Sequence, residues 1–432
     1  MLKGYYYRLY AGISYCNQYI EEFGSNDEEK TAECRFLRAL QYYILMDGWG
    51  NVPFTTKISS ESPTQIKRAD LYAWIESELL DIEDKLSAPT TAYKEGEDGY
   101  GRVNKYTDEL LLSRLYLNAE VYTGTAENTK AAEYAEKVIK NSPYKLHTTK
   151  ATVSGTGNWT TSPYQELFMG DNGTNGASEE SLFSIVQDGQ RTTSWGSTLF
   201  LMAGSTDAKI IVDPNGTTTG NGTTKSWGGN RMRKDLVEKF FPNDDAPNNY
   251  AYQMPKAADD DRAIFDGYGR NLENTTVGTF TDGFAVCKFN NYRTAGTAGS
   301  TEFPDADFFF FRIAEAYLNY AEATARANGG ATTAQGTQYI NDLLNRAHAT
   351  SKEKAAYSLS DICDEWSREF YFEGIRRTTL IRFGRFAGNA NYNWSWKGEA
   401  ANGRNIDAHL NLFAIPTSDL SANHNLVQNP GY

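Results

Sequence analysis

Helical periodicity runs through both ends of this 432-residue chain and gives way in its middle. In residues 27–50, apolar side chains recur at helical spacings until Gly48 and Gly50 stop the pattern. Residues 70–86 carry a second apolar stripe, for which Asp70 is the predicted N-cap. The start of the chain is therefore predicted to be mainly helical.

A more specific helical pattern occupies residues 115–143. Its leucine, tyrosine, alanines and closing proline fall at the spacings of a tetratricopeptide-like helix pair. Small side chains at Ala119, Ala131 and Ala135 would let two helices approach closely, and Pro143 would end the second helix. We favour this repeat over an ordinary helical hairpin, although isolated matches to so degenerate a pattern occur by chance.

The middle of the chain is rich in Gly, Asn and Thr, with the residue chemistry of turns. Short strand-like runs, such as 181–186 and 284–289, lie between the loops, and one helix is predicted at 231–241. Helical patterning then returns in residues 307–330 and 359–386.

The predicted fold is mainly α and forms a single domain over residues 1–432. A tetratricopeptide-like helical scaffold, residues 1–145 and 305–432, carries an irregular loop-rich insert, residues 146–304, with short strands. Binding surfaces tend to lie on such loops, because a rigid scaffold positions them.

The balance of charge argues against two classes of partner. The chain has 42 Lys+Arg and 55 Asp+Glu, which gives a net charge of −13. Nucleic acid or an anionic membrane surface would repel such a protein as a whole. No apolar run is long enough to span a membrane, either.

Aromatic residues are unusually plentiful, at 28 Tyr, 22 Phe and 8 Trp. A protein core cannot easily absorb so many hydroxyl-bearing and indole rings. Some are therefore predicted to be exposed, where their flat faces can stack on a ligand.

Metal and cofactor sites have little support in the sequence. The four histidines share no spacing typical of a transition-metal site, and the four cysteines form no CxxC pair. Residues 213–216 and 258–262 could bind a structural calcium ion through carboxylates and carbonyls. Neither segment matches an EF-hand loop, so solvated turns are the favoured interpretation, and no cofactor is predicted.

Four sequence blocks occur in an order that resembles one known family. Residues 35–54, RFLRALQYYILMDGWGNVPF, resemble its Arg-Ala helix with paired tyrosines, which runs into a glycine and Val-Pro. Residues 308–323 are similar to its Arg-x-Ala-Glu-x-x-Leu-x-x-Ala-Glu-Ala helix, and residues 368–384 to its Arg-Glu-x-x-x-Glu-Gly-x-Arg helix. Residues 412–432 resemble its Ile-Pro…Asn-Pro-Gly-Tyr ending. The chain is thus identified as similar to the SusD/RagB family of outer-membrane, surface-exposed nutrient-binding lipoproteins.

The resemblance implies a function, a partner and a location. It implies a non-enzymatic protein that captures an oligosaccharide or polysaccharide at the extracellular face of the outer membrane and passes it to a SusC-like TonB-dependent transporter. It also implies membrane attachment only through an N-terminal lipid anchor, which lies outside this sequence. A peptide ligand on the same fold is the first alternative, because exposed aromatic rings serve peptides equally well.

The second alternative is a glycoside hydrolase that uses Glu369 and Glu373. Such an enzyme needs one carboxyl group with a raised pKa facing another at roughly 5–10 Å. Here Arg376 and Arg377 follow Glu373 within side-chain reach, and they would hold both glutamates ionised. We therefore predict that the two glutamates belong to the scaffold, and that the chain has no catalytic residues.

The candidate ligand-binding residues fall into two groups. In the insert, rings and polar groups lie in glycine-containing loops: Trp195, Trp227, Tyr268, Arg270 and Tyr292. Glycine leaves a ring face unshielded, and polar neighbours can meet sugar hydroxyls. In a C-terminal loop, Trp394 and Trp396 alternate, and both rings would point the same way if the chain is extended. The alternative for each ring is that it covers a small core beneath its own loop.

Overall fold

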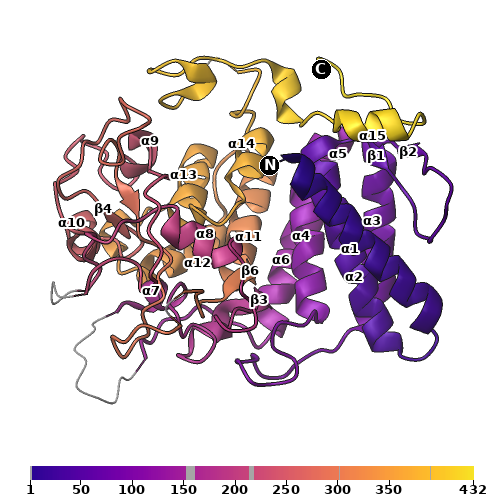
Figure 1. Cartoon of the computed structure of the whole chain (residues 1–432), viewed down its shortest axis with the longest axis horizontal. Helices are drawn as coiled ribbons and strands as arrows, with labels where there is room; N and C mark the ends of the chain where they lie inside the picture. Colours follow the sequence, from indigo (N-terminus) through magenta and orange to yellow (C-terminus); the bar gives the residue numbers. More distant parts are fainter. Residues whose placement is uncertain (1, 152–160, 214–217, 301, 390) are drawn as a thin grey trace.

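Figure 1 shows the computed structural model, which describes residues 2–151, 161–213, 218–300, 302–389 and 391–432. Helices from the start of the chain stand at one end of the molecule, C-terminal helices lie in the centre, and the loop-rich middle segment forms the other end. Outside the middle segment, the helices up to residue 382 are α1 (Leu2–Phe23), α2 (Glu28–Trp49), α3 (Arg68–Ile82), α4 (Lys105–Leu117), α5 (Ala119–Thr123), α6 (Asn128–Asn141), α11 (Ile313–Ala327), α12 (Ala334–Arg346), α13 (Leu359–Phe370) and α14 (Arg376–Arg382).

The remaining elements are short. The helices are α7 (Pro163–Glu166), α8 (Ser197–Ala203), α9 (Lys234–Val237), α10 (Met254–Ala258) and α15 (Thr417–Ala422). The strands are β1 (Val52–Pro53), β2 (Gln65–Ile66), β3 (Ser181–Ile185), β4 (Phe265–Asp266), β5 (Ala285–Val286) and β6 (Phe308–Arg312), which pair in twos as β1–β2, β3–β6 and β4–β5. The molecule is thus mainly α, as predicted.

Small side chains set the close packing of the scaffold. Ala119, Ala131 and Ala135 are fully buried where α4, α5 and α6 meet, and α6 ends two residues before Pro143. Helix α11 packs on α6 and on α12, and its own alanines are buried in the same main core. The predicted pair of closely packed helices is therefore present, and α11 and α12 continue the layer.

Of two helix ends predicted near the start of the chain, one is confirmed and one is wrong. Helix α2 ends at Trp49, and Gly50, with φ of 72°, donates its N–H to the carbonyl of Met46. The stop signal at Gly50 is thus confirmed, whereas Gly48 lies inside the helix. The N-cap predicted at Asp70 is wrong, because α3 begins at Arg68 and Asp70 lies in its first turn. A carboxylate still favours the helix there, where the backbone N–H groups carry partial positive charge.

The phenylalanine run before α11 is a strand, although helix was predicted from residue 307 onward. Phe308–Arg312 forms β6, which pairs antiparallel with β3 so that Ser181 lies opposite Arg312 and Ile185 opposite Phe308. A short apolar run is compatible with either structure, and the partner strand decides it here. Since β3 belongs to the middle segment, this pair joins that segment to the start of α11.

The helical stretch predicted over residues 359–386 is broken in two. Helix α13 ends at Phe370 and α14 begins at Arg376. Between them, Phe372 has φ of 66° and Gly374 has φ of 86°, a left-handed backbone that a right-handed helix does not contain. Glu369 and Glu373 therefore do not lie one turn apart on a helix.

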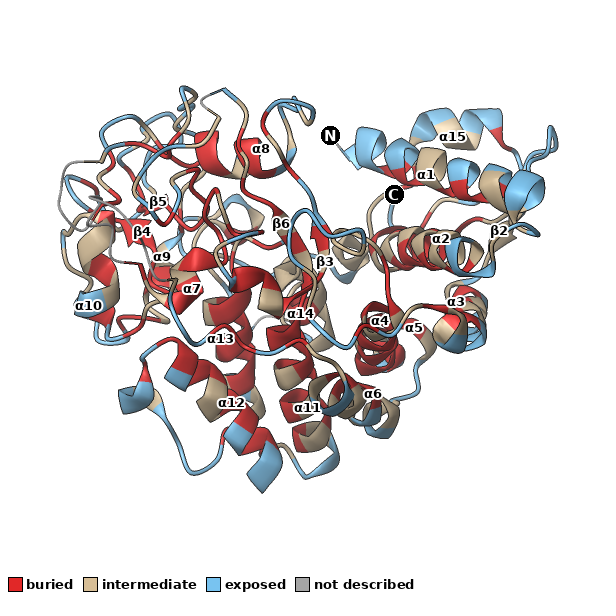
Figure 2. Cartoon of the chain, turned by 90° about the horizontal axis from the view of Figure 1, so that it is seen from below, coloured by how far each residue is buried: buried red, intermediate tan, exposed pale blue. Residues whose placement is uncertain are grey.

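The middle segment has little regular structure but is well packed. The helix predicted at 231–241 shrinks to α9, and the strand-like run at 284–289 contains the two-residue β5. Figure 2 shows buried residues threaded through this part of the chain. They include small cores built from Tyr164, Phe168, Met202 and Phe289, and from Val237, Phe240, Met254 and Phe265.

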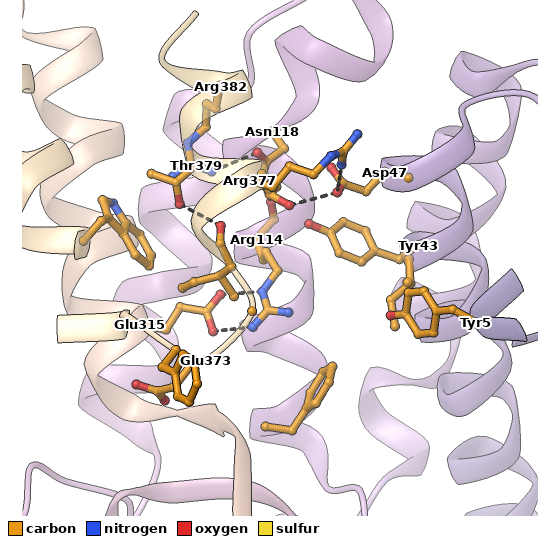
Figure 3. Close-up of a pocket in the computed structure, with 18 of the residues that line it drawn as sticks. Tyr5, Tyr43, Asp47, Arg114, Asn118, Glu315, Glu373, Arg377, Thr379 and Arg382 are labelled. Carbon is orange, nitrogen blue, oxygen red and sulfur yellow. Dashed lines mark hydrogen bonds and ion pairs between the residues drawn. The ribbon is translucent and has the colours of Figure 1, made fainter. Parts of the chain in front are cut away.

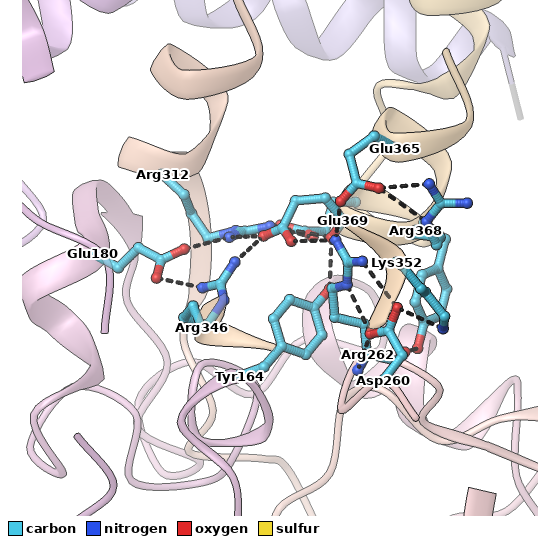
Figure 4. Close-up of polar contacts among 12 residues, drawn as sticks. Tyr164, Glu180, Asp260, Arg262, Arg312, Arg346, Lys352, Glu365, Arg368 and Glu369 are labelled. Carbon is cyan, nitrogen blue, oxygen red and sulfur yellow. Dashed lines mark hydrogen bonds and ion pairs between the residues drawn. The ribbon is translucent and has the colours of Figure 1, made fainter. Parts of the chain in front are cut away.

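A buried network of charged side chains ties the middle segment to the C-terminal helices (Figure 4). Arg312 on β6 pairs with Glu180, Glu369 and Glu373 at 2.6, 3.0 and 2.8 Å. Arg346 on α12 pairs with Glu180 at 2.6 Å, and Arg262 from the middle segment reaches Glu369 at 3.4 Å. Charges buried this deeply persist only when they are paired, so the network fixes how these elements meet.

Candidate functional site

Trp195 and Trp227, predicted separately, lie side by side on the surface. Their ring centroids are 6.4 Å apart and their planes meet at 35°. Phe303 packs edge-on against Trp195 at 5.2 Å, and Phe200 lies 6.3 Å from Trp227. Trp195 is 56% exposed, and Trp227 and Phe200 are each 43% exposed. We call these four rings the aromatic platform.

Helix α8 brings the platform together. Trp195 comes immediately before Gly196, the N-cap of the helix, and Phe200 lies within the helix. The backbone N–H of Trp227 donates to the carbonyl of Ala203, the last residue of α8. A Cβ on Gly228 would come within 3.2 Å of the Phe280 ring, so the chain beside Trp227 approaches that ring closely. This packing holds the backbone while the indole ring stays outside.

Polar groups border the platform. The Lys225 ammonium lies 5.4 Å from the centroid of Trp195 and pairs with Glu302 at 3.0 Å. Arg191 is almost fully exposed near the same loop and lies 3.9 Å from Asp188. Such groups can donate to and accept from hydroxyls beside a stacked ring. Sequence reasoning missed Lys225 and Glu302, since only folding brings both charges beside Trp195.

Tyr268 belongs to a separate tyrosine stack. Its ring lies 3.9 Å from that of Tyr250 at an angle of 24°, and Tyr252 continues the row 5.9 Å beyond. Tyr268 is 53% exposed, so one end of the stack faces solvent. The stack was not predicted, although three tyrosines in residues 250–268 were visible in the sequence.

Arg270 and Tyr292 have supporting positions. Arg270 is buried, pairs with Asp266 at 3.3 Å and donates to the carbonyl of Phe280. The Tyr292 hydroxyl donates to the carbonyl of Thr219 at 2.6 Å, and the half-buried ring packs on a small core. Arg270 thus holds Phe280 in position, and the Phe280 ring packs against the backbone at Gly228.

Trp394 and Trp396 do not form an extended pair. Trp396 has φ of 66°, so the backbone turns and the two rings cannot point the same way as on a strand. Trp394 is half-buried, with Phe386 at 5.9 Å and the Lys397 ammonium 4.6 Å from its centroid. This loop therefore packs against α14 and its surroundings.

The arginines that neutralise Glu369 and Glu373 are not the predicted ones. Arg376 donates to the carbonyl of Cys363, and Arg377 pairs with Asp47. The break after α13 turns both arginines away from Glu369.

Glu369 is instead surrounded by arginines from other elements. Burial acts to raise the pKa of Glu369, but Arg346, Arg312 and Arg262 outweigh it and hold that pKa well below its usual range. Arg312 and Lys288 both bind the carboxylate of Glu373, at 2.8 and 2.7 Å. A proton donor needs the opposite pKa shift, so this arrangement is that of a structural network.

In the two segments that could bind calcium, the described carboxylates contact other protein groups. Asp260 is buried and pairs with Arg262 at 2.9 Å, so the solvated turn predicted at 258–262 is wrong for this residue. Asp261 contacts His348, and Asp259 contacts Ser351. Asp213 is buried and accepts from Thr218, while residues 214–216 lie outside the described part of the chain. Among the described residues, no three His, Cys, Asp or Glu side chains gather as a metal site.

A cavity of about 480 Å³ lies where α1, α2, α4 and α14 meet (Figure 3). Its charged groups are paired: Arg114 with Glu315 at 2.5 Å, Arg377 with Asp47 at 3.3 Å, and Glu373 with Arg312 at 2.8 Å. Arg382 donates to Asn118 at 2.9 Å. None of the predicted ligand-binding residues lines this cavity.

Comparison with known protein families gives two matches. The SusD family model matches residues 269–432, and a second model, described as starch-binding associating with outer membrane, matches residues 2–117. The starch-binding protein SusD of Bacteroides thetaiotaomicron is 38% identical over 464 residues, which cover 99% of this chain and 78% of that protein. None of the described helices has the length and apolar character needed to cross a membrane.

Solved structures with the same fold include two surface glycan-binding proteins A. The one from Bacteroides uniformis has a TM-score of 0.69 at 20% identity and covers 99% of this chain and 85% of that chain. The one from Bacteroides thetaiotaomicron, in complex with laminarihexaose, has a TM-score of 0.68 at 22% identity, with the same coverage of 99% and 85%.

Proposed function

The chain belongs to the SusD family, and we propose that it captures an oligosaccharide or polysaccharide at the cell surface without cleaving it. The relative that is 38% identical to it is a starch-binding protein, and a protein with the same fold was solved with laminarihexaose.

The observation that carries this proposal is the aromatic platform. Two exposed indole rings lie close enough for neighbouring sugar units of one chain, with Lys225 and Glu302 beside them. Stacking of sugar C–H faces removes apolar surface from water, whereas a hydrogen bond to a sugar hydroxyl mostly replaces one to water and contributes about 0.5–1.5 kcal/mol. We therefore assign most of the affinity to Trp195 and Trp227. The tyrosine stack that ends at Tyr268 is a second surface for the same glycan. Trp394 and Trp396 are the second-choice platform.

An array of glycans and peptides tests the ligand class. We expect binding to soluble starch or to laminarihexaose, the glycans named for two of the similar proteins, and no binding to peptides. Retention on peptides alone would move the proposal to the peptide-binding alternative.

The absence of catalysis is a separate part of the proposal. Glu369 and Glu373 are buried in the charged network, and each is neutralised by cations that the fold holds in place. The glycan that binds should therefore be recovered intact after long incubation with the protein. New reducing ends that disappear in Glu369→Gln would contradict this part of the proposal.

We also propose that the protein is held at the outer membrane through an N-terminal lipid anchor and hands its ligand to a SusC-like TonB-dependent transporter. The family description that matches residues 2–117 associates such proteins with the outer membrane.

A further inference from the structure

A groove of about 360 Å³ lies between α9, the α13–α14 turn and the C-terminal loop. Its walls are mainly carbon: Leu236 from α9, Phe370 from the end of α13, Phe372 from the turn, Leu380 from α14, and Phe386 and Trp394 from the loop. None of the four platform rings lines it. A volume of this size is at the lower end of that of small-molecule sites, which span about 300–1,000 Å³.

Three arginines that line the same groove pair with no carboxylate among the described residues. Arg233 donates to the carbonyl of Ser395, and Arg376 donates to the carbonyl of Cys363 and the hydroxyl of Tyr392. Arg231 donates to the carbonyls of Val277 and Thr279. Carbonyl contacts satisfy individual N–H donors but leave the net positive charge in place.

The other charges around the groove do not cancel this excess. Lys239 is paired with Asp364 at 2.8 Å, and Arg377 with Asp47. Among the described residues that line the groove, Asp235 is the one carboxylate. It accepts hydrogen bonds from the N–H and the hydroxyl of Ser395. Burial lowers the pKa of Arg233, and the negative charge of Asp235 opposes this shift only in part. Burial also lowers the pKa of Lys397, whose ammonium lies over the Trp394 ring. Positive charge therefore exceeds negative charge around the groove, although the protein has a net charge of −13, and this local excess favours an anionic ligand.

We propose that this groove binds a small amphipathic carboxylate, with a flat apolar body against Trp394 and Phe386 and the carboxylate at Arg233 and Arg376. The mainly carbon walls favour an aryl or branched alkyl body over a sugar, which would leave its hydroxyls without partners. Arginine presents paired N–H donors that match a carboxylate. The site shares Trp394 with the second-choice platform but none of the four rings of the aromatic platform. It therefore does not depend on glycan binding at Trp195 and Trp227.

The test is calorimetric titration of the whole chain with 1-naphthoate and with its neutral analogue 1-naphthamide. We expect naphthoate to bind about tenfold or more tightly, as a hydrogen bond to a charged group predicts. Arg233→Gln should remove that preference, and Trp394→Ala should weaken both ligands. Arg191→Gln, at an exposed arginine outside the groove, should change neither. Arg233 is chosen over Arg376, because Arg376 also donates to the carbonyl of Cys363 inside α13.

Three results would overturn the inference. The first is equal binding of naphthoate and naphthamide, which would show that the positive charge plays no part. The second is Arg233→Gln binding naphthoate as Arg191→Gln does, with both variants folded by circular dichroism. The third concerns a peptide ligand. Binding of a blocked Phe-Glu dipeptide at least tenfold tighter than naphthoate would assign the groove to an acidic polypeptide segment and would also overturn the small-molecule proposal. Soluble starch should bind the Arg233→Gln variant like wild type, which separates this site from the platform.

Discussion

At the scale of single residues, it is easier to predict that an aromatic ring is exposed than to predict which other rings lie beside it. Trp195 and Trp227 stand beside glycines in polar loops, and this local chemistry correctly indicated that both rings face solvent. That they lie 6.4 Å apart follows from the backbone of Trp227 folding back on the end of α8. No local pattern encodes that contact.

Replacement of either tryptophan tests the platform. We expect Trp195→Ala and Trp227→Ala each to weaken binding of the identified glycan by about 2 kcal/mol, roughly thirtyfold, as for other aromatic hot spots. Isothermal titration calorimetry measures the change. Tyr15→Ala is the matched control, because Tyr15 is an exposed ring on α1, distant in sequence from the platform. Wild-type affinity in both tryptophan variants would exclude the platform.

A buried histidine makes stability depend on pH. His147 lies between Glu166 and Glu179, with each ring nitrogen 2.8 Å from a carboxylate. Burial alone would lower the pKa of His147, but the two carboxylates outweigh it and raise the pKa to about 9. Since the unfolded value is about 6.5, the protonated ring contributes about 3 kcal/mol below that pH, and the contribution is lost as pH rises through 9.

The prediction is that wild type loses its stability advantage over His147→Gln between pH 6.5 and 9.5. Thermal unfolding across that range measures it, with His424→Gln, at an exposed histidine, as the control. A gap between wild type and His147→Gln that stays constant with pH would contradict the assignment.

At the scale of elements, the charged network holds α13 in place. Glu369 accepts from Arg346 and Arg312 on one oxygen and faces Arg262 with the other. Glu369→Gln leaves those buried arginines short of negative charge, so we expect it to lower the free energy of unfolding by about 3–5 kcal/mol. Chemical denaturation measures this loss, and the exposed Glu353→Gln is the control. Glycan affinity in the remaining folded protein should be nearly unchanged, since Glu369 is fully buried and cannot contact a ligand.

The end of α2 offers a second test at this scale. A Cβ on Gly50 would lie 2.9 Å from a methyl carbon of Leu412, and its φ of 72° disfavours any other residue. Gly50→Ala should therefore destabilise the protein by about 1–3 kcal/mol. Gly4→Ala in α1, where a Cβ meets nothing within 4 Å, should stabilise it by about 0.5–1 kcal/mol. Two changes of the same sign would contradict this account of the α2 terminus.

At the scale of the whole molecule, the sequence predicted the architecture better than the element ends. The order of helix-rich and loop-rich segments, the close-packed helices around Ala131 and the family all emerged from local patterns. The strand at Phe308–Arg312 and the break at Phe372 did not, because pairing with β3 and the buried charges around Glu369 are long-range. The partners of Glu373 were misassigned for the same reason.

The proposed transporter partnership is also a property of the whole molecule. Mild detergent extraction of native membranes that carry a tagged version should co-purify a large TonB-dependent barrel. Recovery of the tagged protein alone would count against the partnership, but it would leave glycan capture intact.

The proposed function depends above all on a glycan lying across Trp195 and Trp227. A crystal structure of the protein with the best-binding oligosaccharide from the array tests it most directly. We expect sugar rings stacked on both indoles, with hydroxyls near Lys225 or Glu302. A sugar bound at Trp394 and Trp396, or anywhere else with the platform empty, would contradict it.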